Sequence, residues 1–67
     1  MKLTEDIRGL TKTYTGERGE AILSRNFGNK DKGDKWSVSV IINGEYKRLA
    51  NRVDFNKAFQ MAENEIG

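Results

Sequence analysis

Apolar residues recur at every second position over residues 36–42, in the middle of the chain. The apolar positions are Trp36, Val38, Val40 and Ile42. A period of two places side chains on one face of a β-strand, so this segment is predicted to be a half-buried strand. The following Asn43-Gly44 pair tolerates positive φ and is the typical sequence of a tight β-hairpin.

The return strand of this hairpin, residues 45–52, is basic. A loop of two residues would place Lys47 directly opposite Val40, so we expect a bulge or a longer loop to shift the register. The polar face of the sheet would then carry Ser37 and Ser39, with some of Tyr46, Arg48 and Ala50.

Near the N-terminus, apolar residues follow a helical spacing of four, three and four: Leu3, Ile7, Leu10 and Tyr14. Thr4 is a suitable N-cap and Gly16 a suitable helix end. Gly9 is unfavourable in the middle of a helix, and residues 11–15 have high strand propensity. We favour a helix over residues 4–15, with a first strand as the alternative.

Residues 20–27 are predicted to form a strand, and residues 28–35 contain no apolar side chain and read as an exposed loop. Asp54 is a candidate N-cap for a final helix. The apolar stripe of that helix is Phe55, Ala58, Phe59, Ala62 and Ile66. The small alanines should let the helix lie close to the sheet.

These elements predict a single small α+β domain over residues 1–67. The order is α-β-β-β-α, with a three-stranded antiparallel sheet and both helices packed on one face. The alternative is a four-stranded antiparallel sheet followed by a C-terminal helix.

The absence of Cys and His narrows the possible functions. It removes the common zinc ligands and the common nucleophile–base pairs, so we expect neither a metal, a cofactor nor catalysis. No segment has the length of a membrane span or the apolar core of a signal peptide, so we expect a cytoplasmic protein without a membrane partner.

The net charge is only +2, but its distribution is uneven. Residues 25–52 carry seven basic and three acidic side chains, whereas the last fifteen residues are net acidic. The candidate nucleic-acid contacts are Arg25, Lys30, Lys32, Lys35, Tyr46, Lys47, Arg48 and Arg52. A solvated surface with ordinary scatter of charge explains the same pattern equally well.

The strand–Asn-Gly–strand–helix pattern, with Ala58 and Ala62 after the turn glycine, resembles the double-stranded-RNA-binding domain. That resemblance implies an α-β-β-β-α fold and a loop at residues 28–35 that reaches a minor groove. The chain departs from the family where a lysine cluster should open the second helix, because Lys57 is the one lysine there. Residues 20–66 are also similar to the three-stranded DNA-binding domains at the N-termini of integrases.

Two functions follow as hypotheses. The first is a small non-catalytic module that binds RNA or DNA through the basic hairpin and the lysine-bearing loop. The alternative is a regulator or inhibitor, of the kind that phages and mobile elements encode, which binds a host or partner protein through its exposed sheet face or edge. The chain could act as a monomer or as a homodimer that extends the sheet.

Overall fold

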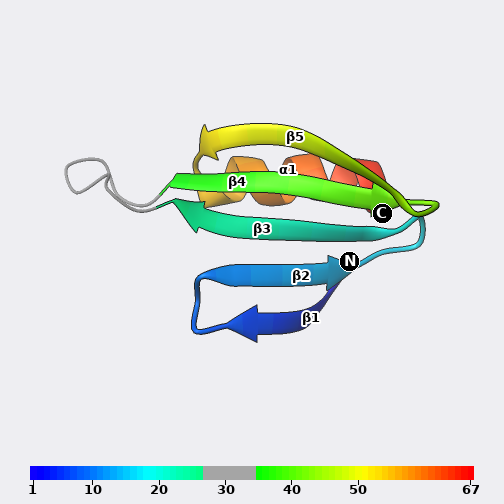
Figure 1. The fold of residues 1–67 in the computed structure, drawn as a ribbon, viewed down its shortest axis with the longest axis horizontal. Helices are drawn as coiled ribbons and strands as arrows, with labels where there is room; N and C mark the ends of the chain where they lie inside the picture. The colour runs from blue at the N-terminus through cyan, green and yellow to red at the C-terminus, as the bar shows by residue number, and fades with distance from the viewer. Residues whose placement is uncertain (27–34) are drawn as a thin grey trace.

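The computed structural model describes residues 1–26 and 35–67, and within them the chain forms one antiparallel sheet and one helix (Figure 1). The sheet order follows the chain, β1-β2-β3-β4-β5, and α1 lies behind it. The elements are β1 (Lys2–Ile7), β2 (Thr11–Thr15), β3 (Glu20–Asn26), β4 (Lys35–Ile42), β5 (Glu45–Val53) and α1 (Phe55–Ile66). In this part of the chain no helix is both long and apolar enough to cross a bilayer.

The predicted N-terminal helix is wrong, because residues 2–15 form a β-hairpin. Arg8 and Gly9 both have positive φ, at 53° and 71°, and the Leu10 N–H donates to the Ile7 carbonyl at 2.8 Å, which closes a turn. Thr4, expected to cap a helix, instead donates its hydroxyl to the Thr13 carbonyl across the hairpin.

This hairpin overturns both the fold class and the resemblances. The sheet has five strands in the described residues, not three, and the four-stranded alternative is one strand short. A double-stranded-RNA-binding domain requires a first helix, and β1 and β2 occupy its place. The similarity to integrase N-terminal domains also fails, because the sheet extends beyond three strands.

The β4–β5 hairpin has the two-residue turn that Asn43 and Gly44 predicted, with φ of 55° and 77°. Lys47 does lie opposite Val40, so the expected register shift at the turn is wrong. Bulges occur farther along, on either side of Val38. They turn Leu49 and Ala50 toward the core, and Arg52 has a φ of 57°.

The final helix begins as predicted, because the Asp54 carboxylate accepts the Lys57 N–H at 2.8 Å. Its apolar side packs mainly on β4, and the buried residues of this core are Tyr14, Ala21, Leu23, Trp36, Val38, Val40, Ala58, Ala62 and Ile66. Two aromatic pairs meet edge to face: Trp36 with Phe55, at 5.0 Å between ring centroids, and Tyr14 with Phe59, at 5.4 Å. Each fully buried aliphatic side chain contributes about 2 kcal/mol.

The loop between β2 and β3 holds the last turn of the helix. Arg18 donates its backbone N–H to the Ile66 carbonyl at 2.9 Å. Its guanidinium donates to the carbonyls of Glu65 and Asn64, at 2.9 and 3.1 Å. These bonds satisfy carbonyls that have no partner within the helix.

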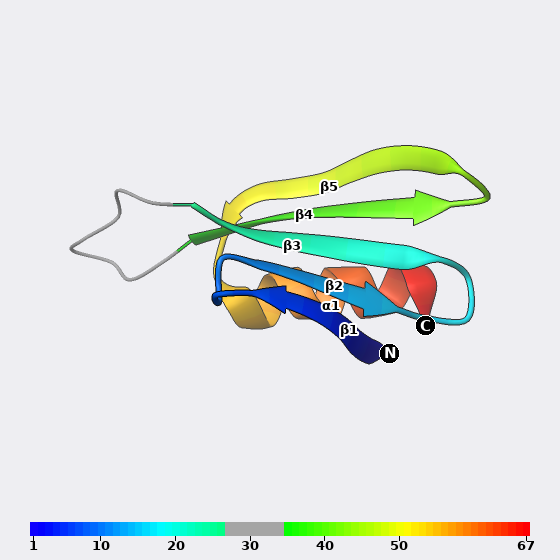
Figure 2. The same ribbon diagram turned by 60° about the horizontal axis from the view of Figure 1, so that its bottom comes forward.

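Because α1 covers one side of the sheet, the other side has no layer on it in the described residues (Figure 2). The helix packs on β3, β4 and β5, so β1 lies beyond its cover. Within the described residues, the uncovered face and the β1 edge are therefore both open to a partner.

Candidate binding surface on the open sheet face

The uncovered side of the sheet, which we call the open face, presents three cross-strand rows of side chains. The rows are Ile7, Thr11, Ser24 and Ser37; Glu5, Thr13, Ile22, Ser39 and Arg48; and Lys2, Thr15, Glu20, Ile41 and Tyr46. Nearly half of these side chains are Ser or Thr, although two of them, Ser37 and Ser39, are buried. Hydroxyl groups both donate and accept hydrogen bonds, so the surface is polar without being highly charged.

Tyr46 is the large aromatic side chain of this face, and it is 58% exposed. Its phenolic oxygen lies 2.8 Å from the Ser39 hydroxyl, which is buried in the neighbouring strand. Hydrogen bonds from Ser39 and from the Arg48 guanidinium, together with the charge of Arg48, hold the pKa of the Tyr46 phenol below its ordinary value. The hydroxyl is thus fixed while much of the ring stays accessible.

A second polar group lies at the other end of β5, around Ser37. The Ser37 hydroxyl bonds to the side-chain amides of Asn26, at 2.9 Å, and Asn51. The Ser37 hydroxyl faces the Oδ1 of both amides, and because it has one proton it can donate to one of them at a time. The N–H₂ groups of the two amides take no part in these bonds.

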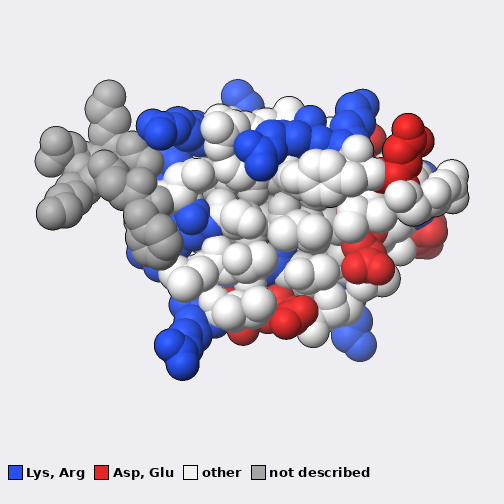
Figure 3. Space-filling view, viewed as in Figure 1, with Lys and Arg blue, Asp and Glu red and all other residues white. Residues whose placement is uncertain are grey.

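Charge on the open face is arranged along its margins (Figure 3). Basic side chains follow the β5 margin, acidic side chains gather at the end near the β4–β5 turn, the β1 margin carries both signs, and most of the centre is uncharged. The cations whose register places them on this face are Lys2, Lys35 and Arg48, against Glu5 and Glu20. The surface therefore has a weak basic bias along one side.

The structure divides the predicted nucleic-acid contacts between the two sides of the sheet. Lys35, Tyr46 and Arg48 lie on the open face. Arg25 is opposite Trp36, in phase with buried Leu23, and so lies on the helix side. Arg52 is exposed within a bulge. Lys30, Lys32 and most of the predicted loop over 28–35 lie outside the described residues.

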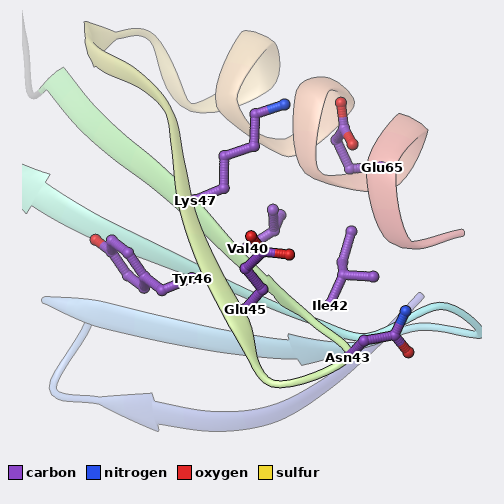
Figure 4. Close-up of a pocket in the computed structure, with 7 residues that line it drawn as sticks. All are labelled: Val40, Ile42, Asn43, Glu45, Tyr46, Lys47 and Glu65. Atoms are coloured by element: carbon purple, nitrogen blue, oxygen red, sulfur yellow. The ribbon is translucent and has the colours of Figure 1, made fainter.

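Lys47 points away from the open face, because its partner Val40 belongs to the core. Figure 4 shows Lys47 and Tyr46 leaving β5 in opposite directions, with Lys47 directed toward Glu65 on α1. Lys47 and Glu65 border a shallow hollow of about 430 Å³ between the hairpin and the end of the helix. Lys47 and Arg48 belong to one predicted basic group, but their side chains lie on opposite sides of the sheet.

Sequence reasoning missed the residues that position Tyr46 and the amide pair. Ser37 and Ser39 were assigned to the polar face, but their partners Tyr46, Asn26 and Asn51 depend on the register of β5 and of β3. Leu3 and Ile7 of β1, which the helical spacing predicts to be buried, are exposed. Within the described residues no three acidic side chains lie close enough together to hold a metal ion.

No protein-family model, no curated protein and no solved structure significantly matches this chain.

Proposed function

We propose that this protein is a non-catalytic binding module whose open face takes single-stranded nucleic acid. The observation that carries the proposal is Tyr46, an exposed aromatic ring whose hydroxyl is held by Ser39 and whose neighbour is Arg48. A base can stack on such a ring, and a guanidinium beside it can contact the adjoining phosphate.

The shape of the surface favours a single strand over a duplex. Five strands span about 19 Å at the usual spacing between strands. The major groove of B-DNA is about 12 Å wide and admits a two-stranded ribbon, not a sheet of this width. A single strand can lie across a flat face and place its bases on it, as in sheet-based RNA-binding domains.

The path of the strand follows from the two polar groups described above. Ser39 holds Tyr46 and Ser37 holds the Asn26–Asn51 amides, and these two serines are about 7 Å apart along β4. One nucleotide would stack on Tyr46, and its neighbour would meet the amides. Lys35 lies at the far end of the same face and would contact the next phosphate.

The test is the anisotropy of fluorescently labelled single-stranded DNA and RNA, with duplexes of the same length as competitors. Trp36 is a poor reporter, because it is buried on the helix side. We expect binding at low salt that weakens as salt is added. The logarithm of the affinity should fall by about one per tenfold rise in salt for each phosphate contact. Tyr46→Ala should weaken binding about tenfold, whereas Tyr46→Phe should keep most of the affinity.

Arg48 and Lys47 provide a matched pair of variants. Arg48→Gln and Lys47→Gln remove one positive charge each from adjacent residues whose side chains lie on opposite sides of the sheet. We expect Arg48→Gln to weaken binding and to lower the slope of log affinity against log salt by about one. Lys47→Gln should change both the affinity and that slope much less. Equal effects of the two variants, or no binding at low salt, would contradict the proposal.

A second candidate is a partner protein that docks on the same face. It is favoured by Ile22 and Ile41, which lie half-buried in the uncharged centre beside Tyr46. Tyrosine and arginine are also enriched at protein interfaces. In that case Ile41→Thr should weaken binding of the partner more than Arg48→Gln does, and added salt should have little effect.

A further inference from the structure

The outer edge of β1 is unpaired within the described residues, and all six residues of this strand are exposed. Its side chains include Leu3, 44% exposed, and Ile7, 51% exposed. Together with Tyr46 they are the large apolar side chains that the described part of the molecule exposes. An edge strand that exposes apolar side chains is a template for pairing with another strand.

The opposite edge of the sheet is protected against such pairing. Two bulges interrupt β5, and Arg52 has a positive φ within the second one. Lys47, Arg48 and Arg52 add positive charge along that strand. Bulges and repeated like charge are the usual means by which proteins prevent pairing at an edge, so the β1 edge is the one available to a partner.

We propose that the β1 edge pairs with the β1 edge of a second copy of this chain, in antiparallel orientation. The proposal rests on the charges of β1 on the open face, which are positive at Lys2 and negative at Glu5, because the Asp6 carboxylate is already paired with Lys12. An antiparallel two-fold arrangement brings the Lys2 end of each strand beside the acidic end of the other. A parallel arrangement would place like charges side by side.

The register of the hairpin supports the same arrangement. Lys2 pairs with Thr15 and Glu5 with Thr13, so the bulge at Thr4 brings Lys2 and Glu5 onto the open face together. Ile7 shares that face through Thr11. The aliphatic stem of Lys2 from one copy can then cover Ile7 of the other while its ammonium reaches Glu5.

Such a dimer would have a continuous sheet of ten strands with both open faces on the same side. The two Tyr46 residues would lie on the two outer strands, about 43 Å apart. This interface is independent of what the open face binds, so it stands or fails separately from the proposed function.

Sedimentation equilibrium of the intact chain over a range of concentrations tests the dimer. We expect reversible dimerisation, with the β1 amides becoming more protected from hydrogen exchange as concentration rises. Lys2→Glu and Glu5→Lys should each weaken the dimer about tenfold, because each places like charges across the interface twice. The double variant with both changes should restore the wild-type affinity. Ile7→Thr, which keeps strand propensity, should also weaken the dimer.

Urea unfolding of each variant at low concentration provides the control, since the monomers should have similar stability. If the chain stays monomeric up to about 1 mM, its dimerisation free energy is less than about 4 kcal/mol, and the proposal is overturned. The edge would then be left to a strand from another protein. A dimer that the double variant fails to restore would overturn it as well.

Discussion

The backbone N–H of Arg18 donates to the carbonyl oxygen of Ile66 at 2.9 Å, and this bond ties the β2–β3 loop to the end of the helix. Gly16, two residues earlier, lies against the same carbonyl so closely that a Cβ on it would collide with the Ile66 backbone. The obstructing atoms belong to the backbone and cannot rotate away. The loop and the helix end therefore form one packed unit.

Gly16→Ala should lower the free energy of unfolding by about 3 kcal/mol, because either the loop or the helix end must move. Gly44→Ala is the control: its φ is 77°, but the space around it is open, so only the cost of a left-handed alanine applies, about 1 kcal/mol. Urea denaturation followed by Trp36 fluorescence measures both. Equal losses would show that the contact at Ile66 relaxes freely.

The Tyr46 phenol should lose its proton below its ordinary pKa of 10.0, because the hydrogen bonds from Ser39 and Arg48 stabilise the phenolate. Arg48→Gln removes one of these bonds and a positive charge, so it should raise the Tyr46 pKa. Ser39→Ala should raise it too. The NMR shifts of the Tyr46 ring during an alkaline titration report the midpoint, and an unchanged midpoint in both variants would contradict the hydrogen-bond arrangement.

The first hairpin should loosen in acid. Lys12 donates to the Asp6 carboxylate at 2.6 Å and the Gly9 N–H donates to it at 2.8 Å, and these bonds hold the Asp6 pKa below its ordinary value of 3.8. Since the folded-state pKa is lowered, the stabilisation is complete above pH 3.8 and is lost as the pH falls through the lowered value. Hydrogen exchange of the β1 and β2 amides should accelerate there, and Asp6→Asn should remove this pH dependence.

Ala62 is fully buried where the helix meets the sheet, so a larger side chain has no room. Ala62→Leu should destabilise the fold by about 2 kcal/mol through overpacking. Gln60→Leu, at an exposed position of the same helix, should change stability by less than about 0.5 kcal/mol. A similar effect of the two variants in urea denaturation would mean that the helix does not lie as close to the sheet as the structure has it.

Those features of the fold that depend on neighbouring residues could be predicted from the sequence. The strand at β4, the Asn43-Gly44 turn, the Asp54 cap and the small face of the helix at Ala58 and Ala62 were confirmed, whereas β4 is buried at Ser37 and Ser39 as well as at its apolar positions. Each is a local preference that the surrounding structure reinforces.

The N-terminal hairpin could not be predicted because two patterns fitted the same residues. The spacing of Leu3, Ile7, Leu10 and Tyr14 fits a helix, but it also arises when a turn at Arg8 and Gly9 folds one strand onto another. Arginine rarely adopts positive φ, so a turn at Arg8 is not expected from the residue type. The strand propensity of residues 11–15 was the correct signal, and tertiary pairing with β3 favoured it.

The residue types of the candidate site could be predicted from the sequence, but the positions of their side chains relative to one another could not. Tyr46 and Arg48 were identified from the sequence, but the separation of Lys47 from them follows from the register set by the two-residue turn. The partners of Tyr46 and Ser37 come from strand pairing, which no local pattern specifies.

The bond between Arg18 and the end of the helix also bears on how the chain folds during synthesis. Arg18 and Glu65 are 47 positions apart, so this contact cannot form until the last turn has left the ribosome. Before then the apolar side of the nascent sheet, with Leu23, Val38 and Val40, has no helix to cover it. The emerging chain is thus exposed to aggregation until α1 arrives, and it is at this stage that a chaperone would matter most.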